Sequence, residues 1–330
     1  MSLPSFFPIL VATTLAFGGA AALAQSQQYR EQEVLDPATG TWGELPEPPP
    51  DPPTDELGRA RTLLAEGNWR GANRLLKRWL EENGDHDRYL EGVFLYGESY
   101  FERGWYWEAY EQYEIVAEQG SGELFQLALR RETDVARAFL AGKKRRVLRI
   151  FWIVAYDDGI KILDRVWERT PGTRLGEIAL KLKADYFFNT GELQSAQDEY
   201  VNLAREYPAG RFTRFAALRA AEAAAAAFPG IAYDERPLLN AQERYQEVLR
   251  VYPEYAQQQR VEERLSGIRS QRAEKDLYVA KWYERTGRRG AAEFYYRQIL
   301  ADWPETLAAA EAESRLRGLG FESVETGGAP

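Results

Sequence analysis

The feature that most constrains the fold is a spaced pattern of small and large residues that recurs along residues 54–318. In each copy a small residue precedes a glycine, and an alanine with a large residue four positions later follows it. The clearest copy consists of Ala184, Phe187, Gly191, Leu193, Ala196, Tyr200, Leu203 and Pro208. The last copy repeats these positions as Ala280, Tyr283, Gly287, Ala292, Tyr296, Ile299 and Pro304.

The copies share one phase, which indicates a true repeat. The positions equivalent to the second alanine are 72, 109, 159, 196, 241 and 292. In three of the copies that have an alanine at this position, a proline follows twelve residues later, at positions 208, 253 and 304. A further copy near the N-terminus consists of Gly97, Tyr100, Gly104, Tyr106, Ala109, Tyr113 and Val116. Several copies in one phase indicate repetition far more strongly than any single match.

Apolar residues within each copy recur at spacings of three and four, which predicts helices. A glycine between two such helices and a small residue inside each of them permit a closely packed antiparallel hairpin, as in tetratricopeptide repeats. We therefore predict an all-α fold, a right-handed superhelix of about six tetratricopeptide-like helical hairpins with a C-terminal capping helix over about residues 307–317. The repeat-signature residues are assigned to packing rather than to a binding site. No strand is expected after residue 54.

The segments outside the repeats predict an exported protein. The first 24 residues carry no charged side chain and end in Ala22-x-Ala24, a pattern typical of signal-peptide cleavage. Six prolines in residues 45–53 favour an extended spacer. The predicted organisation is a signal peptide at 1–24, a proline-rich disordered linker at 25–53, a repeat solenoid at 54–318 with N-terminal repeats at 54–171 and C-terminal repeats at 172–318, and a flexible tail at 319–330.

The composition leaves few residues for catalysis. The chain has no Cys and a single His, His86, in a polar stretch, so thiol nucleophiles and most zinc sites lack their ligands. The formal net charge of −9 opposes an extended phosphate-binding surface. The adjacent acids Asp157 and Asp158 are the remaining candidates for carboxylate chemistry, although helix capping is the favoured interpretation. We expect a non-enzymatic protein with no cofactor, no metal, no nucleic-acid partner and no small-molecule substrate.

The last copy carries more than the repeat pattern. Its run from Ala273 to Tyr283, with the core Leu277-Tyr-Val-Ala-x-Trp-Tyr283, and the later stretch Ile299 to Thr306 resemble the closing repeat of the BamD family. That family comprises the tetratricopeptide lipoproteins of the outer-membrane β-barrel assembly machinery. The resemblance implies a periplasmic scaffold whose N-terminal repeats bind unfolded outer-membrane β-barrel precursors. It also implies that the C-terminal repeats hold a BamA-like barrel subunit.

The chain departs from the family pattern at one position. Gln25 stands where family members carry a lipobox cysteine. We therefore expect an exported, non-lipidated protein in the periplasm, peripherally associated with the outer membrane. The alternative is another periplasmic tetratricopeptide adaptor, of the type associated with the Tol-Pal system in cell-envelope or cell-division coordination. Such adaptors usually begin with a coiled coil, whereas the corresponding segment here is rich in proline.

The first helix of each hairpin should line the inner surface of the superhelix. A groove that mixes rings and charges there is a candidate site for an extended peptide, because aromatic side chains contribute most of the affinity in such sites. Projection from the repeat register places in this groove Leu57, Arg61, Leu64, Glu91, Phe94, Glu98 and Phe101. The alternative is that Phe94 and Phe101 pack on the first helix of the next repeat.

The third copy is interrupted by an insertion at residues 143–156. It has five basic residues and no acidic one, so it stands out from an acidic chain. One interpretation is a long loop whose second half, Ile150 to Tyr156, folds back onto the solenoid. The other is a contact with anionic lipid or an acidic partner. The candidate contact residues are Lys143, Lys144, Arg145, Arg146, Arg149, Phe151 and Trp152.

Overall fold

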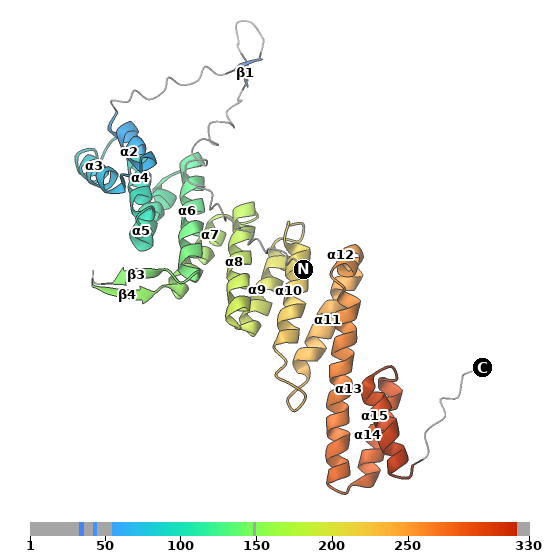
Figure 1. The fold of residues 1–330 in the computed structure, drawn as a ribbon. Coiled ribbons are helices and arrows are strands. Elements are labelled where there is room, and N and C mark those ends of the chain that lie inside the picture. The colour runs from blue at the N-terminus through green and yellow to red at the C-terminus, as the bar shows by residue number, and fades with distance from the viewer. Residues whose placement is uncertain (1–32, 36–41, 45–54, 148–149, 322–330) are drawn as a thin grey trace, which may run out of the picture. The chain divides into compact units, whose positions relative to one another are not determined.

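The computed structural model describes residues 33–35, 42–44, 55–147 and 150–321 (Figure 1). The predicted signal peptide lies outside the described residues, and so do most of the linker and the tail. The chain divides into two compact units, Met1–Gly120 and Ser121–Pro330, and each is described by itself.

The first unit contains two short strands and two helical hairpins. In order, these elements are β1 (Glu33–Leu35), β2 (Trp42–Glu44), α2 (Glu56–Ala65), α3 (Trp69–Glu82), α4 (Tyr89–Phe101) and α5 (Tyr106–Gln119). Strands β1 and β2 pair antiparallel. Each helix packs on the next one, and α2 also contacts α4, the first helix of the second hairpin.

The second unit continues the succession of hairpins. Its elements are α6 (Gly122–Leu140), β3 (Lys144–Val147), β4 (Phe151–Val154), α7 (Tyr156–Arg169), α8 (Arg174–Thr190), α9 (Leu193–Glu206), α10 (Thr213–Ala226), α11 (Arg236–Val251), α12 (Pro253–Gln258), α13 (Val261–Arg285), α14 (Arg289–Asp302) and α15 (Leu307–Gly318). The hairpins α6/α7, α8/α9, α10/α11 and α13/α14 pack one after another, and α15 packs on both helices of the last one.

This packing confirms the predicted all-α fold of consecutive tetratricopeptide-like hairpins. The capping helix is also confirmed, because Ala308, Ala309, Ala312 and Leu316 of α15 are buried in the core of the last hairpin. The expectation that no strand follows residue 54 was wrong, since the insertion forms an antiparallel pair of strands, β3 and β4.

The repeat-signature residues lie at the centre of each hairpin. The alanines at the aligned positions, Ala72, Ala109, Ala196, Ala241 and Ala292, have no exposed surface. Among the aligned aromatics, Tyr113, Tyr200 and Tyr296 are also fully buried, and Tyr245 is nearly so. Small residues therefore allow the helices to approach, and a tyrosine fills the space between them, as the pattern predicts.

The glycines that end the first helices are required by the backbone. Gly191 has φ 81° and its amide bonds back to the carbonyls of Phe187 and Phe188, which closes α8. This left-handed conformation is costly for any residue with a Cβ atom. Gly104 and Gly287 adopt the same conformation, with φ 74° and 76°. The glycine in the repeat pattern is therefore the turn between the two helices of a hairpin.

Helix α13 is unusual because it belongs to two cores. Its first half places Val261, Leu265 and Ile268 in the core of the α10/α11 hairpin. Its second half places Leu277 and Ala280 in the core that α14 and α15 complete. A single helix of 25 residues thereby joins the fifth hairpin to the sixth.

Candidate protein-binding surfaces

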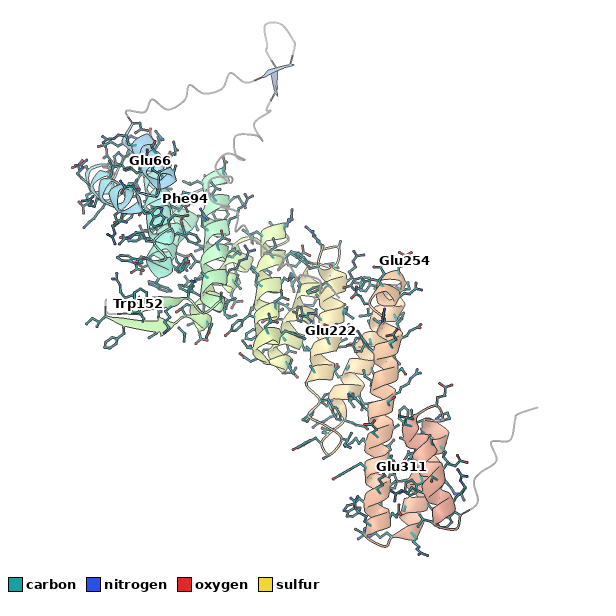
Figure 2. The ribbon with its side chains drawn as sticks, viewed as in Figure 1. Glu66, Phe94, Trp152, Glu222, Glu254 and Glu311 are labelled. Atoms are coloured by element: carbon teal, nitrogen blue, oxygen red, sulfur yellow. The ribbon has the colours of Figure 1, made fainter. Side chains whose placement is uncertain are left out.

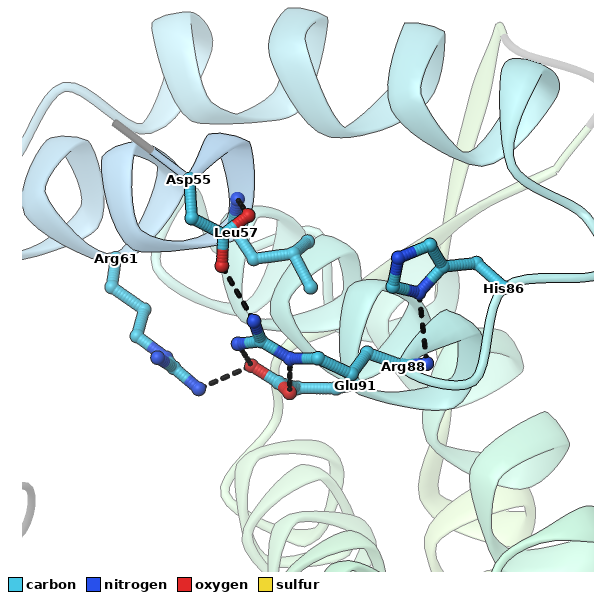
Figure 3. A network of polar contacts seen from close by, with 6 residues as sticks. All are labelled: Asp55, Leu57, Arg61, His86, Arg88 and Glu91. Atoms are coloured by element: carbon cyan, nitrogen blue, oxygen red, sulfur yellow. Dashed lines mark hydrogen bonds and ion pairs between the residues drawn. The ribbon is translucent and has the colours of Figure 1, made fainter. Parts of the chain in front are cut away.

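Two of the residues predicted to line a groove, Arg61 and Glu91, belong to a network of ion pairs in the first unit (Figure 3). The guanidinium of Arg88 donates to both carboxylate oxygens of Glu91, at 2.8 and 2.9 Å, and to Asp55 at 2.5 Å. These hydrogen bonds, above all those to Glu91, raise the pKa of Arg88 above its ordinary value. Arg61 of α2 is the second cation on Glu91. The network therefore joins α2 to α4 on their shared face.

The other predicted groove residues contribute more to packing than the sequence indicates. Leu57 is 1% exposed and belongs to the core of the first hairpin, so it does not line a surface. Leu64 is half-buried against the same core. In the second hairpin, Glu98 accepts a hydrogen bond from the hydroxyl of Tyr113 at 2.6 Å. The carboxylate of Glu98 thus binds a side chain at the centre of its own hairpin.

Phe94 and Phe101 lie between core and surface. Phe94 lies on α4 (Figure 2), and its ring is 5.6 Å from that of Tyr113. The ring of Phe101 lies 5.3 Å edge-on to that of Tyr106. Both partners belong to α5, the second helix of the same hairpin. Each phenylalanine keeps part of its surface accessible. They can therefore add apolar area to a bound segment without leaving their packing positions.

A hollow lies between the first helices of two successive hairpins in the second unit. Its volume is about 500 Å³, and α6 and α8 line it. Arg130, Asp134 and Arg137 come from α6, and Arg174 and Ile178 come from α8. Asp134 pairs with Arg137 at 3.0 Å, so the lining is basic overall. The predicted location of a groove, on the first helices, thus also holds a polar hollow that sequence reasoning did not single out.

The last hairpin exposes a connected row of aromatic rings. Trp282 contacts Tyr283 at 4.9 Å, Tyr283 stacks on Tyr295 at 5.2 Å, and Tyr295 contacts Phe294 at 5.5 Å. The two ends of this row, Trp282 and Phe294, are 43% and 63% exposed. Tyr278 lies one helical turn before Trp282 and is 42% exposed. We call the connected rings of Trp282, Tyr283, Tyr295 and Phe294, together with Tyr278, the aromatic row.

Part of this row lies in the closing motif of the sequence, from which no exposed surface was predicted. The core positions of α13 are Ala273, Leu277 and Ala280. Tyr278 and Trp282 are four residues apart, so they share one face of the helix. It is not the face of those core positions but one that usually carries polar side chains. Large aromatic residues on the polar face of a helix are the sequence pattern that predicts such an exposed row.

The insertion residues lie on the pair of strands between α6 and α7. Lys143 and Lys144 are exposed, and Arg145 forms an ion pair with Asp158 of α7 at 2.8 Å. Phe151 and Trp152 are 60% and 53% exposed. Arg149 lies outside the described residues. Residues 150–154 do not fold back onto the helices, because each of their side chains is exposed, whereas Ala155 is buried and Tyr156 contacts Tyr186 of α8.

Within the described part of the chain, no group of His, Asp and Glu side chains is arranged to hold a metal ion. Asp157 and Asp158 lie in the first turn of α7. The positive end of the helix dipole stabilises acidic side chains there. His86 is exposed and its Nδ1 accepts a hydrogen bond from the amide of Arg88. No helix among the residues that the structure describes is long and apolar enough to cross a membrane.

A comparison with known protein families finds a similarity within the second unit. The model of the YfiO family, described as an outer membrane lipoprotein, matches residues 172–317. This range includes the aromatic row. No curated protein matches the sequence.

Solved structures offer more distant likenesses. The C-terminal part of a TPR repeat-containing protein from Cytophaga hutchinsonii is 14% identical, with a TM-score of 0.39, covering 79% of this chain and 88% of that one. Nearly identical TPR-like repeats assigned to a kinesin light chain of Podosopora anserina are 16% identical, with a TM-score of 0.34, covering 62% and 95%.

The helix packing of this chain therefore establishes the tetratricopeptide fold, and the C-terminal repeats are similar to the YfiO family. Both are those of a protein-interaction scaffold. Residues 172–317 are thus similar to the YfiO (BamD) family of outer membrane lipoproteins.

Proposed function

We propose that this chain is a non-catalytic periplasmic scaffold in outer-membrane protein assembly. Its C-terminal repeats bind a BamA-like barrel subunit, and its N-terminal repeats bind unfolded outer-membrane β-barrel precursors. The observation that carries the proposal is the aromatic row, because it is exposed and lies inside the segment that matches the family.

The aromatic row has the properties of a protein-binding hot spot. Trp and Tyr dominate such sites because they bury a large area at low cost in side-chain entropy. Here the rings of Trp282, Tyr283, Tyr295 and Phe294 hold one another in place through successive contacts. Arg288 lies 5.6 Å from the ring of Trp282 and adds a cation at its edge. A partner therefore meets a preorganised surface.

The precursor-binding half of the proposal is supported by the first helices of the hairpins. Phe94 and Phe101 offer partly accessible rings, and Arg61 with Glu91 offers paired charges. The hollow between α6 and α8 adds arginine side chains that suit the carbonyl groups of an extended chain. Unfolded barrel precursors present alternating apolar and polar residues, which such mixed surfaces accommodate.

Affinity purification from envelope membranes tests the proposal. A Trp282→Ala, Phe294→Ala variant removes both ends of the aromatic row. Truncating a hot-spot aromatic costs roughly 2 kcal/mol or more, so recovery of the BamA-like subunit should fall at least about tenfold. Tyr233→Ala is the matched control, because Tyr233 is 61% exposed and lies in the loop before α11. Circular dichroism should show that both variants remain folded.

The same purification separates the proposal from its alternative. A barrel protein that is recovered with the wild type and the control, but lost with the row variant, is the expected result. Recovery of cell-division or peptidoglycan proteins without a barrel subunit would instead indicate an adaptor of the Tol-Pal-associated type.

A further inference from the structure

We propose that the strands β3 and β4 form a membrane-contact element, which inserts its apolar side chains into the interface of an anionic phospholipid bilayer. This inference does not depend on the proposed partners. It rests on four observations on the second unit: the exposure of β4, the distribution of its side chains on both faces, the fixed base of the strands and their charge.

The first observation is an unbroken run of exposed apolar side chains. Ile150, Phe151, Trp152, Ile153 and Val154 are between 42% and 73% exposed. The other exposed large apolar residues of the described chain are separated along the sequence. A contiguous exposed apolar patch of this kind marks an interaction site. Solvent exposure of five successive large side chains is otherwise costly.

The second observation concerns the two faces of the β3/β4 ribbon, that is, of the two-stranded antiparallel sheet that these strands form. Arg146 pairs with Trp152 and Lys144 with Val154, so Trp152 and Val154 share one face. Phe151 and Ile153 share the opposite face, because successive side chains of a strand alternate. Docking on a protein surface covers one face of a ribbon and leaves the other in water. A bilayer interface surrounds an inserted ribbon and removes both faces from water.

The third observation is that the helix-proximal ends of the strands are packed against the helices, whereas the remainder of the strands extends outward. Ala155, directly after β4, is 1% exposed, and the ring of Tyr156 contacts that of Tyr186 on α8 at 5.8 Å. The ion pair of Arg145 with Asp158 ties β3 to α7. Within the second unit, the strands extend outward from α6 and α7 (Figure 2). An isolated pair of strands is marginally stable, so this anchoring gives the apolar residues a defined direction.

The fourth observation is the charge of the strands. Lys143, Lys144, Arg145 and Arg146 are basic, and residues 143–154 contain no acidic side chain. Cations beside Trp and Phe suit the boundary between anionic headgroups and acyl chains. The whole chain has a formal net charge of −9. An anionic surface therefore attracts this element and repels the remainder, which orients the protein.

A fluorophore at position 151 tests the inference directly. The sequence has no cysteine, so Phe151→Cys introduces a single labelling site for an environment-sensitive dye. We expect a blue shift and increased emission when the labelled protein meets vesicles of equal parts phosphatidylcholine and phosphatidylglycerol. Leu307→Cys is the control, because Leu307 is 89% exposed and lies at the start of α15, and its label should not respond.

Vesicle flotation of unlabelled variants supplies the second measurement. Phe151→Ser, Trp152→Ser should reduce the partition coefficient on the anionic vesicles by about tenfold or more, since two large apolar side chains are lost. Lys143→Glu, Lys144→Glu should reduce it by a similar factor and abolish the preference for anionic over phosphatidylcholine vesicles. Arg74→Glu, Lys77→Glu reverses two exposed charges on α3 and should leave flotation unchanged.

Two results would overturn the inference. One is equal flotation of the wild type and the Phe151→Ser, Trp152→Ser variant, with no response of the dye at position 151. The other is a label at position 151 that ignores vesicles but becomes shielded when an envelope protein is added, which would make these strands a protein-docking site. Neither experiment uses the BamA-like partner, so failure here leaves the proposed scaffold function untouched.

Discussion

At the scale of single residues, each regular repeat depends on a contact between a small residue and a buried tyrosine. In the second hairpin, a Cβ atom added to Gly97 would lie 2.7 Å from Cε1 of Tyr113. That ring has no exposed surface and its hydroxyl is held by Glu98. The ring therefore cannot move aside without breaking the centre of the hairpin.

Gly97→Ala should consequently destabilise the protein. Overpacking of this kind costs about 1–3 kcal/mol, which exceeds the 0.5–1 kcal/mol that an alanine otherwise adds to a helix. Gly267→Ala is the matched control, because Gly267 also lies within a helix and its added Cβ would meet no atom within 4 Å. Urea unfolding followed by circular dichroism should show a lower free energy of unfolding for Gly97→Ala and a slightly higher one for Gly267→Ala. Equal behaviour of the two would contradict the packing argument.

The buried tyrosines also donate to acids on the preceding helix. Tyr200 donates to Asp185 and Tyr296 to Glu284, both at 2.5 Å, which repeats the pair of Tyr113 and Glu98. Burial, followed by the hydrogen bond to Asp185, raises the pKa of Tyr200 well above its ordinary value near 10. The folded state thus holds this proton more tightly than the unfolded chain does.

This pairing predicts a loss of stability in alkali. Because the folded pKa of Tyr200 is raised, its contribution is complete below pH 10 and is lost as the pH rises above it. Tyr200→Phe should cost about 1–2 kcal/mol at neutral pH, since Asp185 keeps its pair with Lys181. The variant should also lose less stability than the wild type between pH 9 and about pH 11. Parallel pH profiles in urea unfolding would show that the hydroxyl is not coupled to folding.

The small residues and tyrosines were predictable, because a repeated spacing specifies which positions are buried. Their acidic partners were not. Glu98, Asp185 and Glu284 are three among 51 acidic residues, and no spacing distinguishes a carboxylate that accepts from a tyrosine from one on the surface. For the same reason Glu98 was assigned to a groove, although its side chain serves the core.

At the scale of elements, the strands β3 and β4 escaped prediction for a physical reason. A half-buried strand reveals itself by alternation of apolar and polar residues. Phe151 to Val154 are apolar throughout and exposed on both faces, so no alternation marks them. Helix α13 was recognised only in its second half, because the run from Ser266 to Arg272 is largely polar and hides the continuity of the helix.

The continuity of α13 makes a prediction about cooperativity. Arg269 is exposed and lies between the part of the helix that packs on α11 and the part that packs on α14. Arg269→Pro should break the helix there at a cost of about 3 kcal/mol or more, whereas Arg269→Ala should be nearly neutral. Since neighbouring repeats stabilise one another through their shared elements, the proline variant should lose the last hairpin before the rest of the unit.

Hydrogen exchange read out by mass spectrometry would measure this directly. The proline variant should show rapid exchange in residues 270–318, with protection retained in α8 to α11. Uniform loss of protection across the second unit would show that α13 is not the link between the two cores.

At the scale of the whole molecule, the repeat pattern predicted the hairpins, and the closing motif predicted the similarity of residues 172–317 to the YfiO family. The binding surfaces were less predictable. Arg61 and Glu91 do meet on the surface of the first unit, but Leu57 is in the core. The repeat register identifies the direction that each face of a helix points in. It does not show which individual side chains pack within the fold and are therefore not available for binding. The aromatic row became visible only once the core positions of α13 were known.

The central claim is that the aromatic row binds a BamA-like barrel subunit. Site-specific photo-crosslinking in intact cells tests it most directly, with a photoreactive phenylalanine analogue replacing Trp282 and, as a control, Leu239 of α11, which is 39% exposed. We expect one major adduct at position 282, identified by mass spectrometry as the barrel subunit, and none at position 239. Absence of that adduct at position 282, or the same adduct at both positions, would contradict the claim.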